Sequence, residues 1–187
     1  MNRYATIFRN WFSYAAMITL VCGIVYVTVQ QSYRMSANDP QFQVAEDTAL
    51  ALDKGADPKT LTGTNDGVEI SQSLALWLII YDMQGNVAAT STRLDGAAPQ
   101  FPKGVLDHAR SKGANAVTWQ PRPGLRQATV TVGAKDYTVV AGRSLRLTEE
   151  RISLLGSQVL FGWVLSVLAM LVVAFLQEMV IKRPATS

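Results

Sequence analysis

The residues of this chain that could do chemistry are mostly aromatic or basic, and they lie on segments with the composition of β-strands. Trp77 and Tyr81 have the same strand parity in SLALWLIIYD, and Trp119 lies in NAVTWQ. Three arginines lie on or beside neighbouring strand candidates: Arg122, Arg126 and Arg143. An aromatic wall next to a guanidinium suits a small carboxylate or similar anion. The alternative, which we favour, is that the aromatic rings fill a core and the arginines pair with surface acids.

Catalytic and metal chemistry lack the residues they need. His108 is the only histidine, so a typical zinc site cannot form, and Asp107 beside it points elsewhere on a helix. The serines have no Gly-x-Ser-x-Gly context, and no glycine-rich phosphate loop follows a strand. Four loop acids lack the spacing of a calcium loop: Asp53, Asp57, Asp66 and Glu69. We therefore expect no catalytic residue, no metal and no cofactor.

Two uncharged runs predict helices that cross a membrane. One lies between Arg9 and Arg34 and the other between Arg151 and Glu178. A hydrocarbon core of about 30 Å requires about 20 apolar helical residues, and neither run shows a polar face. We place the membrane spans at residues 11–30 and 154–177. A cleaved signal peptide is the alternative for the first run, but the run is longer than a typical signal core and no small-residue site follows closely.

The charges predict the orientation of these helices. Residues 1–10 and 178–187 carry Arg3, Arg9, Lys182 and Arg183, and basic segments stay in the cytoplasm. Residues 31–153 then form a domain outside the cytoplasm, and the two helices anchor the chain in the bacterial inner membrane. This segment holds 13 of the 17 Lys and Arg and 13 of the 14 Asp and Glu, so the net charge of +3 comes from the ends and does not indicate nucleic acid. The single cysteine, Cys22, lies in the first span, so the domain must be stable without a disulfide.

Small residues recur at a spacing of four within both spans. They are Ala15, Thr19 and Gly23 in the first span, and Gly162 and Ser166 in the second. This spacing lets helix backbones approach closely, so these faces could join the two helices, a homodimer mate or the helices of another membrane protein. Chance occurrence in helices of this composition is the alternative.

The outward segment alternates between helix and strand patterns. A helix is expected from Asp39-Pro40, with Asp39 as its cap and Gly55 at its end, followed by a loop over 55–67. Residues 74–92 predict a hairpin, 94–102 a loop and 103–113 a short helix. Three strands follow, and in the middle one Gln127, Thr129 and Thr131 lie opposite Ala128, Val130 and Val132, which is typical of a half-buried strand. The prediction is an α+β domain with a five-stranded antiparallel sheet and its helices on one side.

Two stretches carry a family resemblance. LIIYDMQGNVAATS at 78–91 is a strand, a glycine turn and a small-residue strand, and YTVVAGRSLRLTEERI at 137–152 is a closing strand that leads into the second span. Together with the order of elements, they resemble the periplasmic PAS-like or single-Cache sensor domains of bacterial two-pass receptors, notably sensor histidine kinases. The resemblance implies a ligand on the sheet face and signalling through the membrane helices. It covers residues 31–176, and the sequence carries no kinase or other output module.

Two functions follow as hypotheses. The first is a sensor or binding module that relays a signal to a separate partner protein, with a small molecule as its candidate ligand. The second is a non-catalytic accessory subunit that uses the same domain for docking. A cavity against Trp77 and Tyr81 favours the first, and a filled sheet face favours the second. The sequence also predicts a hinge-like start of the domain at Asn-Asp-Pro and a stiffer exit over 143–156, where no helix breaker precedes Gly156.

Overall fold

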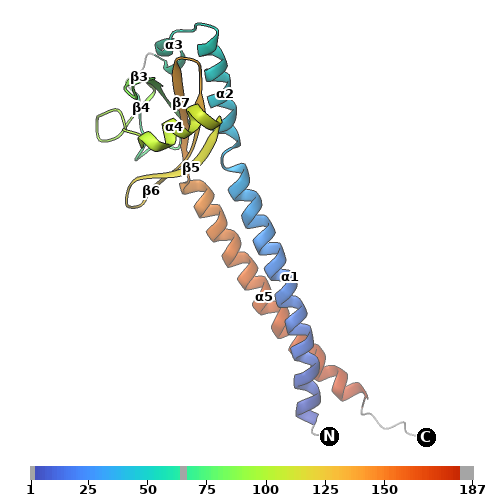
Figure 1. Ribbon diagram of the computed structural model, residues 1–187. Coiled ribbons are helices and arrows are strands. Elements are labelled where there is room, and N and C mark those ends of the chain that lie inside the picture. Colours follow the sequence, from blue (N-terminus) through green and yellow to red (C-terminus); the bar gives the residue numbers. More distant parts are fainter. Residues whose placement is uncertain (1–2, 64–66, 182–187) are drawn as a thin grey trace, which may run out of the picture. The chain divides into compact units, whose positions relative to one another are not determined.

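The computed structural model describes residues 3–63 and 67–181 of the 187-residue chain. The chain divides into two compact units, one formed by residues 1–33 with 150–187 and the other by residues 34–149 (Figure 1). The first unit consists of two long apolar helices. The second is an α+β domain that lies between these helices in the sequence.

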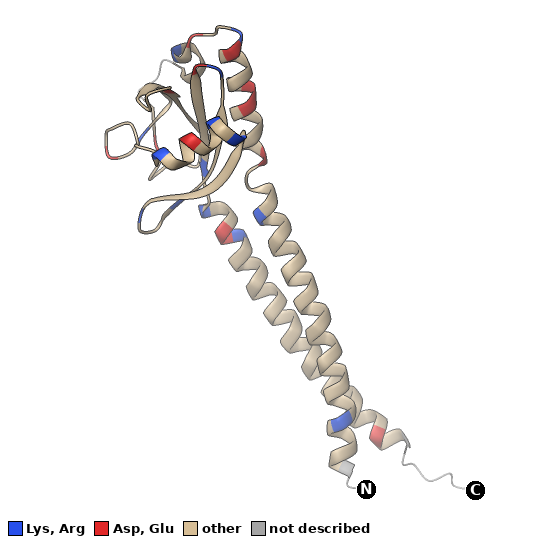
Figure 2. Ribbon diagram, viewed as in Figure 1, with Lys and Arg blue, Asp and Glu red and all other residues tan. Residues whose placement is uncertain are grey.

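α1 (Arg3–Ser36) and α5 (Arg146–Ile181) are the two helices of the described chain that are long and apolar enough to cross a membrane. At 1.5 Å per residue, each exceeds the length that a hydrocarbon layer of about 30 Å requires. Large apolar side chains such as Phe12, Leu20 and Phe161 are exposed along them. Long stretches of both helices carry no charge (Figure 2). The tail residues Lys182 and Arg183, used above to orient the chain, lie outside the described residues.

A two-residue turn, Ala37 and Asn38, separates α1 from α2 (Asp39–Asp53). The predicted break is therefore confirmed, but the predicted cap is wrong. Asn38 takes the cap position with helical backbone angles and makes no side-chain cap bond, so Asp39 already belongs to the first helical turn. There its carboxylate still interacts favourably with the positive end of the helix dipole. Gly55, with a φ of 90°, follows the end of α2 as predicted.

The sheet of the domain confirms the predicted α+β fold with five antiparallel strands. The order across the sheet is β3-β2-β7-β6-β5, and every neighbouring pair is antiparallel. β7 is thus the middle strand. The strands are β2 (Trp77–Asp82), β3 (Val87–Thr90), β5 (Asn115–Arg122), β6 (Leu125–Gly133) and β7 (Tyr137–Ser144).

Helices cover both faces of this sheet, so the prediction of helices on one side is wrong. α2 packs its apolar stripe, including Ala45 and Ala49, against one face that includes Leu78 and Val139. α4 (Lys103–Lys112) buries Leu106 on the opposite face, within a second apolar cluster. The sheet is therefore the middle layer of three, which explains why the WLIIY run of β2 is buried throughout.

The polar side of β6 is buried as well, which corrects the expected half-buried strand. Gln127, Thr129 and Thr131 are fully buried. They share the face under α4, whose backbone comes so close that a Cβ at Gly133 would meet the carbonyl oxygen of Ala109 at 3.0 Å. Alternation of polar and apolar residues on β6 therefore distinguishes two covered faces and does not mark exposure.

Three short elements were not predicted. α3 (Pro58–Thr62) forms within the expected 55–67 loop, and Asp57 caps it by accepting a bond from the Lys59 N–H at 3.1 Å. β1 (Val68–Glu69) pairs in parallel with β4 (Thr92–Arg93) outside the main sheet. Pieces of two to five residues carry too few side chains to show a periodicity.

Candidate functional site

The three aromatic residues predicted to line a pocket belong to the core of the domain. Trp77 and Tyr81 are at most 1% exposed, and Trp119 is 9% exposed. Trp119 packs edge-on against Trp77 with ring centroids 5.9 Å apart, and Phe101 lies 5.0 Å from Trp119. The fold thus brings the predicted aromatic residues together, and Phe101 joins them from a segment expected only as a loop.

The indole of Trp77 spans three strands. Trp77 on β2 lies opposite Gly142 on β7, and a Cβ at position 142 would overlap the indole ring. Its Nε1–H reaches further, donating to Oε1 of Gln127 on β6 at 3.1 Å. The side chain therefore fills space above the sheet that a ligand in the predicted position would need.

Tyr81 is held in the same cluster as a neutral phenol. Its hydroxyl donates to the carbonyl oxygen of Pro99 at 2.9 Å. Burial raises the pKa of Tyr81 to about 12, because a phenolate would lose its hydration in this core. The group is therefore a hydrogen-bond donor at neutral pH and has no role as a base there.

The three predicted arginines do not gather beside the aromatic wall. Arg122 pairs with Asp95 at 2.9 Å, and Arg126 pairs with the carboxylate of Glu149. Arg143 donates from Nε to the carbonyl oxygen of Leu74 at 3.2 Å. Each arginine thus has its own partner elsewhere.

Arg110 is a bonded arginine that the sequence reading missed. It projects from α4 and donates from Nε to Thr138 Oγ1 at 2.7 Å, and from Nη2 to the carbonyl oxygen of Asp82 at 2.7 Å. A third bond, from Nη1, reaches the carbonyl oxygen of Met83 at 3.0 Å. Arg110 thereby joins α4, β7 and the turn after β2. Its remote partners leave no local sequence signal.

The acids and the histidine considered for metal binding are dispersed. His108 is exposed, and Asp107 contacts Arg110 at 3.5 Å. Asp53 accepts a bond from the backbone N–H of Lys135, while Asp57 caps α3. Glu69 accepts from the hydroxyl of Ser71, and Asp66 lies outside the described residues. No group of three or more metal-ligating side chains occurs within residues 3–63 and 67–181.

A short stretch of β6, residues 126–128, binds the turn that leads into α2. We call this stretch the junction segment. Gln41, which is fully buried, donates from Nε2 to the carbonyl oxygen of Ala128 at 3.3 Å. The same Nε2 donates to the carbonyl oxygen of Ala37 at 2.9 Å. The turn between α1 and α2 is therefore bonded to β6 through one buried amide.

The junction segment also binds the start of α5. Leu145 is the single residue between β7 and α5, and its N–H donates to the carbonyl oxygen of Arg126 at 3.0 Å. The guanidinium of the same Arg126 pairs with Glu149 in the first turn of α5. Both connections of the domain to the long helices are thus bonded to the same stretch of one strand.

Two tryptophans join the long helices. Trp11 on α1 donates from Nε1 to the carbonyl oxygen of Val167 at 3.0 Å, and Trp163 on α5 donates from Nε1 to the hydroxyl of Thr19 at 2.8 Å. Position 11 of α1 bonds to position 167 of α5, and position 19 bonds to position 163, so the two helices run antiparallel. In an apolar environment an indole N–H needs a protein partner, which makes these two bonds specific to the pairing.

Only part of the predicted small-residue faces joins the two helices. Ala15 is half-buried, and Thr19 accepts the bond from Trp163. Gly23 and Gly162 have no atom within 4 Å of where a Cβ would stand. Ser166 is exposed. Gly162 and Ser166 therefore make no close contact in the pairing of α1 with α5, whereas Gly23 borders open space along the seam.

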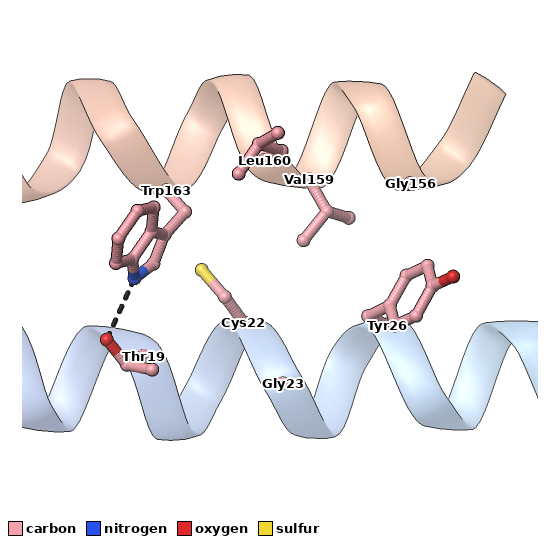
Figure 3. Close-up of a pocket in the computed structure, with 8 residues that line it drawn as sticks. All are labelled: Thr19, Cys22, Gly23, Tyr26, Gly156, Val159, Leu160 and Trp163. Atoms are coloured by element: carbon pink, nitrogen blue, oxygen red, sulfur yellow. Dashed lines mark hydrogen bonds between the residues drawn. The ribbon is translucent and has the colours of Figure 1, made fainter. Parts of the chain in front are cut away.

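An open apolar groove of about 450 Å³ follows the seam of the helix pair (Figure 3). The indole of Trp163 points at Thr19 across it, and Cys22 and Tyr26 also line it from α1. A second hollow of about 410 Å³ shares Thr19 and Gly23 and lies along α1 alone. The linings are almost entirely apolar, so hydrocarbon of lipid or of another helix suits them.

Comparison of the chain with protein-family models, with curated proteins and with solved structures gives no match.

Proposed function

We propose that the chain is a two-pass protein of the bacterial inner membrane whose α+β domain, residues 31–153, lies outside the cytoplasm. In this proposal the domain is a PAS-like or Cache-like binding module. It relays a binding event to a separate membrane protein through α1 and α5. Supporting the membrane placement are the lipid-suited surfaces of both helices and the basic residues at both ends of the sequence.

The observation that carries the relay is the bonding of both helix connections to the junction segment. Gln41 holds the turn before α2 on Ala128, and Arg126 holds Leu145 and Glu149 at the start of α5. A displacement of β6 therefore acts on both connections. A relay needs a contact that differs between two states, because binding can shift an equilibrium only through such groups, and we propose that the junction segment supplies it.

A docking subunit is the second candidate, and a specific observation favours it. Trp77, Trp119 and Phe101 fill the sheet face where the family resemblance places a ligand. A filled face suits a domain that binds another protein by its surface.

The experiment that separates the two candidates measures the spacing of the helices in the full chain. Spin labels replace Phe8 and Phe175, which are exposed on α1 and α5, in a Cys22→Ser background in lipid nanodiscs. The distance distribution is compared between this chain and its Gln41→Leu variant. The relay predicts a shifted or broadened distribution when the Gln41 tie is removed. An unchanged distribution, with the domain still folded, supports the docking subunit and contradicts the relay.

A further inference from the structure

The two connections of the domain are held by contacts of different physical kinds. At the start, Gln41 is a neutral, fully buried side chain. At the exit, the side chains of Arg126 and Glu149 are charged and are 43% and 44% exposed. The same strand thus holds one connection by a buried neutral contact and the other partly by an exposed ionic one.

These two kinds of contact differ in what it takes to break them. Breaking a buried hydrogen bond leaves polar groups without water and costs about 1–3 kcal/mol for each such group. An exposed ion pair contributes only about 0–1 kcal/mol, and salt weakens it further. The Arg126–Glu149 ion pair is therefore the weaker of these two side-chain contacts.

Arg126 also has unused capacity for another anion. A guanidinium carries five N–H donors, and among the described residues the side chain of Arg126 bonds only to Glu149, through Nη1. The remaining donors can take a second carboxylate, because the planar guanidinium matches carboxylate oxygens in pairs.

We infer that the Arg126–Glu149 pair is a releasable latch on the first turn of α5. A carboxylate of a bound partner protein that engages Arg126 draws it from Glu149 and frees this turn, while Gln41 keeps the turn before α2 in place. The inference rests on the proposed relay and names its moving part. It also reverses the sequence-based expectation of a hinge-like start and a stiffer exit.

Amide hydrogen exchange of the full chain in nanodiscs tests the latch. The backbone N–H of Glu149 donates to the carbonyl oxygen of Leu145 at 2.9 Å, and the backbone N–H of Leu145 donates to the carbonyl oxygen of Arg126 at 3.0 Å. Both amides therefore report on the latch. Glu149→Gln should speed exchange at these two amides by up to about fivefold, and raising NaCl from about 20 to about 500 mM should do the same in the unmodified chain. Exchange at the N–H of Phe42, which donates to Asn38, should not change.

Three further variants make the result decisive. Asp95→Asn breaks a comparably exposed ion pair with Arg122, away from the latch, and should leave both amides unchanged. Arg126→Glu should speed their exchange, and combining it with Glu149→Arg should restore slow exchange by re-forming the pair in reverse. The latch is wrong if Glu149→Gln has no effect, if the charge swap fails to restore protection while the amides of β6 and β7 stay protected, or if Phe42 changes equally. Failure of the relay itself would appear separately, in the spin-label distances.

Discussion

The indole ring of Trp77 lies over Gly142, in the space that any side chain at position 142 would occupy. The two residues are direct partners across β2 and β7. Glycine at this point lets the indole cross the middle strand and bond to Gln127 on the next one. The domain thereby closes one sheet face with its own side chains, and that closure leads to the first prediction.

Gly142→Ala should destabilise the domain by roughly 1–3 kcal/mol or more, because the new methyl group forces the indole out of its place. The measurement is denaturant unfolding of the full chain in detergent, followed by tryptophan fluorescence. Gly104→Ala is the matched control: this glycine lies in α4 with open space at its Cβ position, so alanine should be neutral or slightly stabilising. Equal stability of the two variants would contradict the packing described for Trp77.

Tyr81 should make the domain less stable in alkali. The pKa of this phenol is about 12 in the folded chain, against about 10 for an unfolded tyrosine. Between these values the unfolded chain has lost the proton while the folded chain keeps it, so stability falls by about 1.4 kcal/mol per pH unit as pH rises from about 10 towards 12. Tyr81→Phe should remove this part of the slope, whereas Tyr137→Phe, on β7, should keep it. Identical slopes for Tyr81→Phe and the unmodified chain would refute the assignment.

The bond from Trp163 to Thr19 should couple the two residues energetically. A double-mutant cycle with Trp163→Phe and Thr19→Val, measured by detergent-induced unfolding of the helix pair, should give a coupling of about 0.6 and at most about 1.7 kcal/mol. Trp11→Phe with Thr19→Val is the control cycle and should be additive, because Trp11 bonds to the backbone of Val167. Coupling of the same size in both cycles would show that the hydrogen bond is not its source.

Arg110→Lys should destabilise the domain by about 1–3 kcal/mol, because an ammonium cannot reach the three acceptors that the guanidinium joins. Lys112→Gln, two residues further along α4 and exposed, should change stability by less than about 0.5 kcal/mol. Both are measured by denaturant unfolding. A tolerated lysine at position 110 would mean that the three bonds contribute little to holding α4 on the sheet.

The sequence predicted the elements that have a long, regular pattern. The apolar run of β2 and the uncharged runs of α1 and α5 are examples, since burial over many residues leaves a strong signal. The pattern of β6 misled because a polar side chain can be buried when it finds an internal partner: the Thr129 hydroxyl donates to the carbonyl oxygen of Val117 at 2.8 Å. The polar side chains of β6 therefore did not indicate a face exposed to solvent.

The contacts of the candidate site could not be predicted in the same way. Gln41 and Ala128 are 87 positions apart, and Arg122 and Asp95 are 27 apart. The sequence singled out aromatic and basic residues, but which of them meet depends on a topology in which β2 pairs with β7. Sequence reading selected the residues, and long-range pairing decided their partners.

Site-specific labelling of the full chain in cells tests the membrane placement on which the account depends. Single cysteines replace Tyr4, Lys112 or Met179 in the Cys22→Ser background, and all three positions are exposed. A membrane-impermeant maleimide added to intact spheroplasts should label Lys112→Cys only, and added to inverted vesicles it should label Tyr4→Cys and Met179→Cys only. Labelling of all three from one side, or a mature chain that has lost position 4, would contradict the two-pass account.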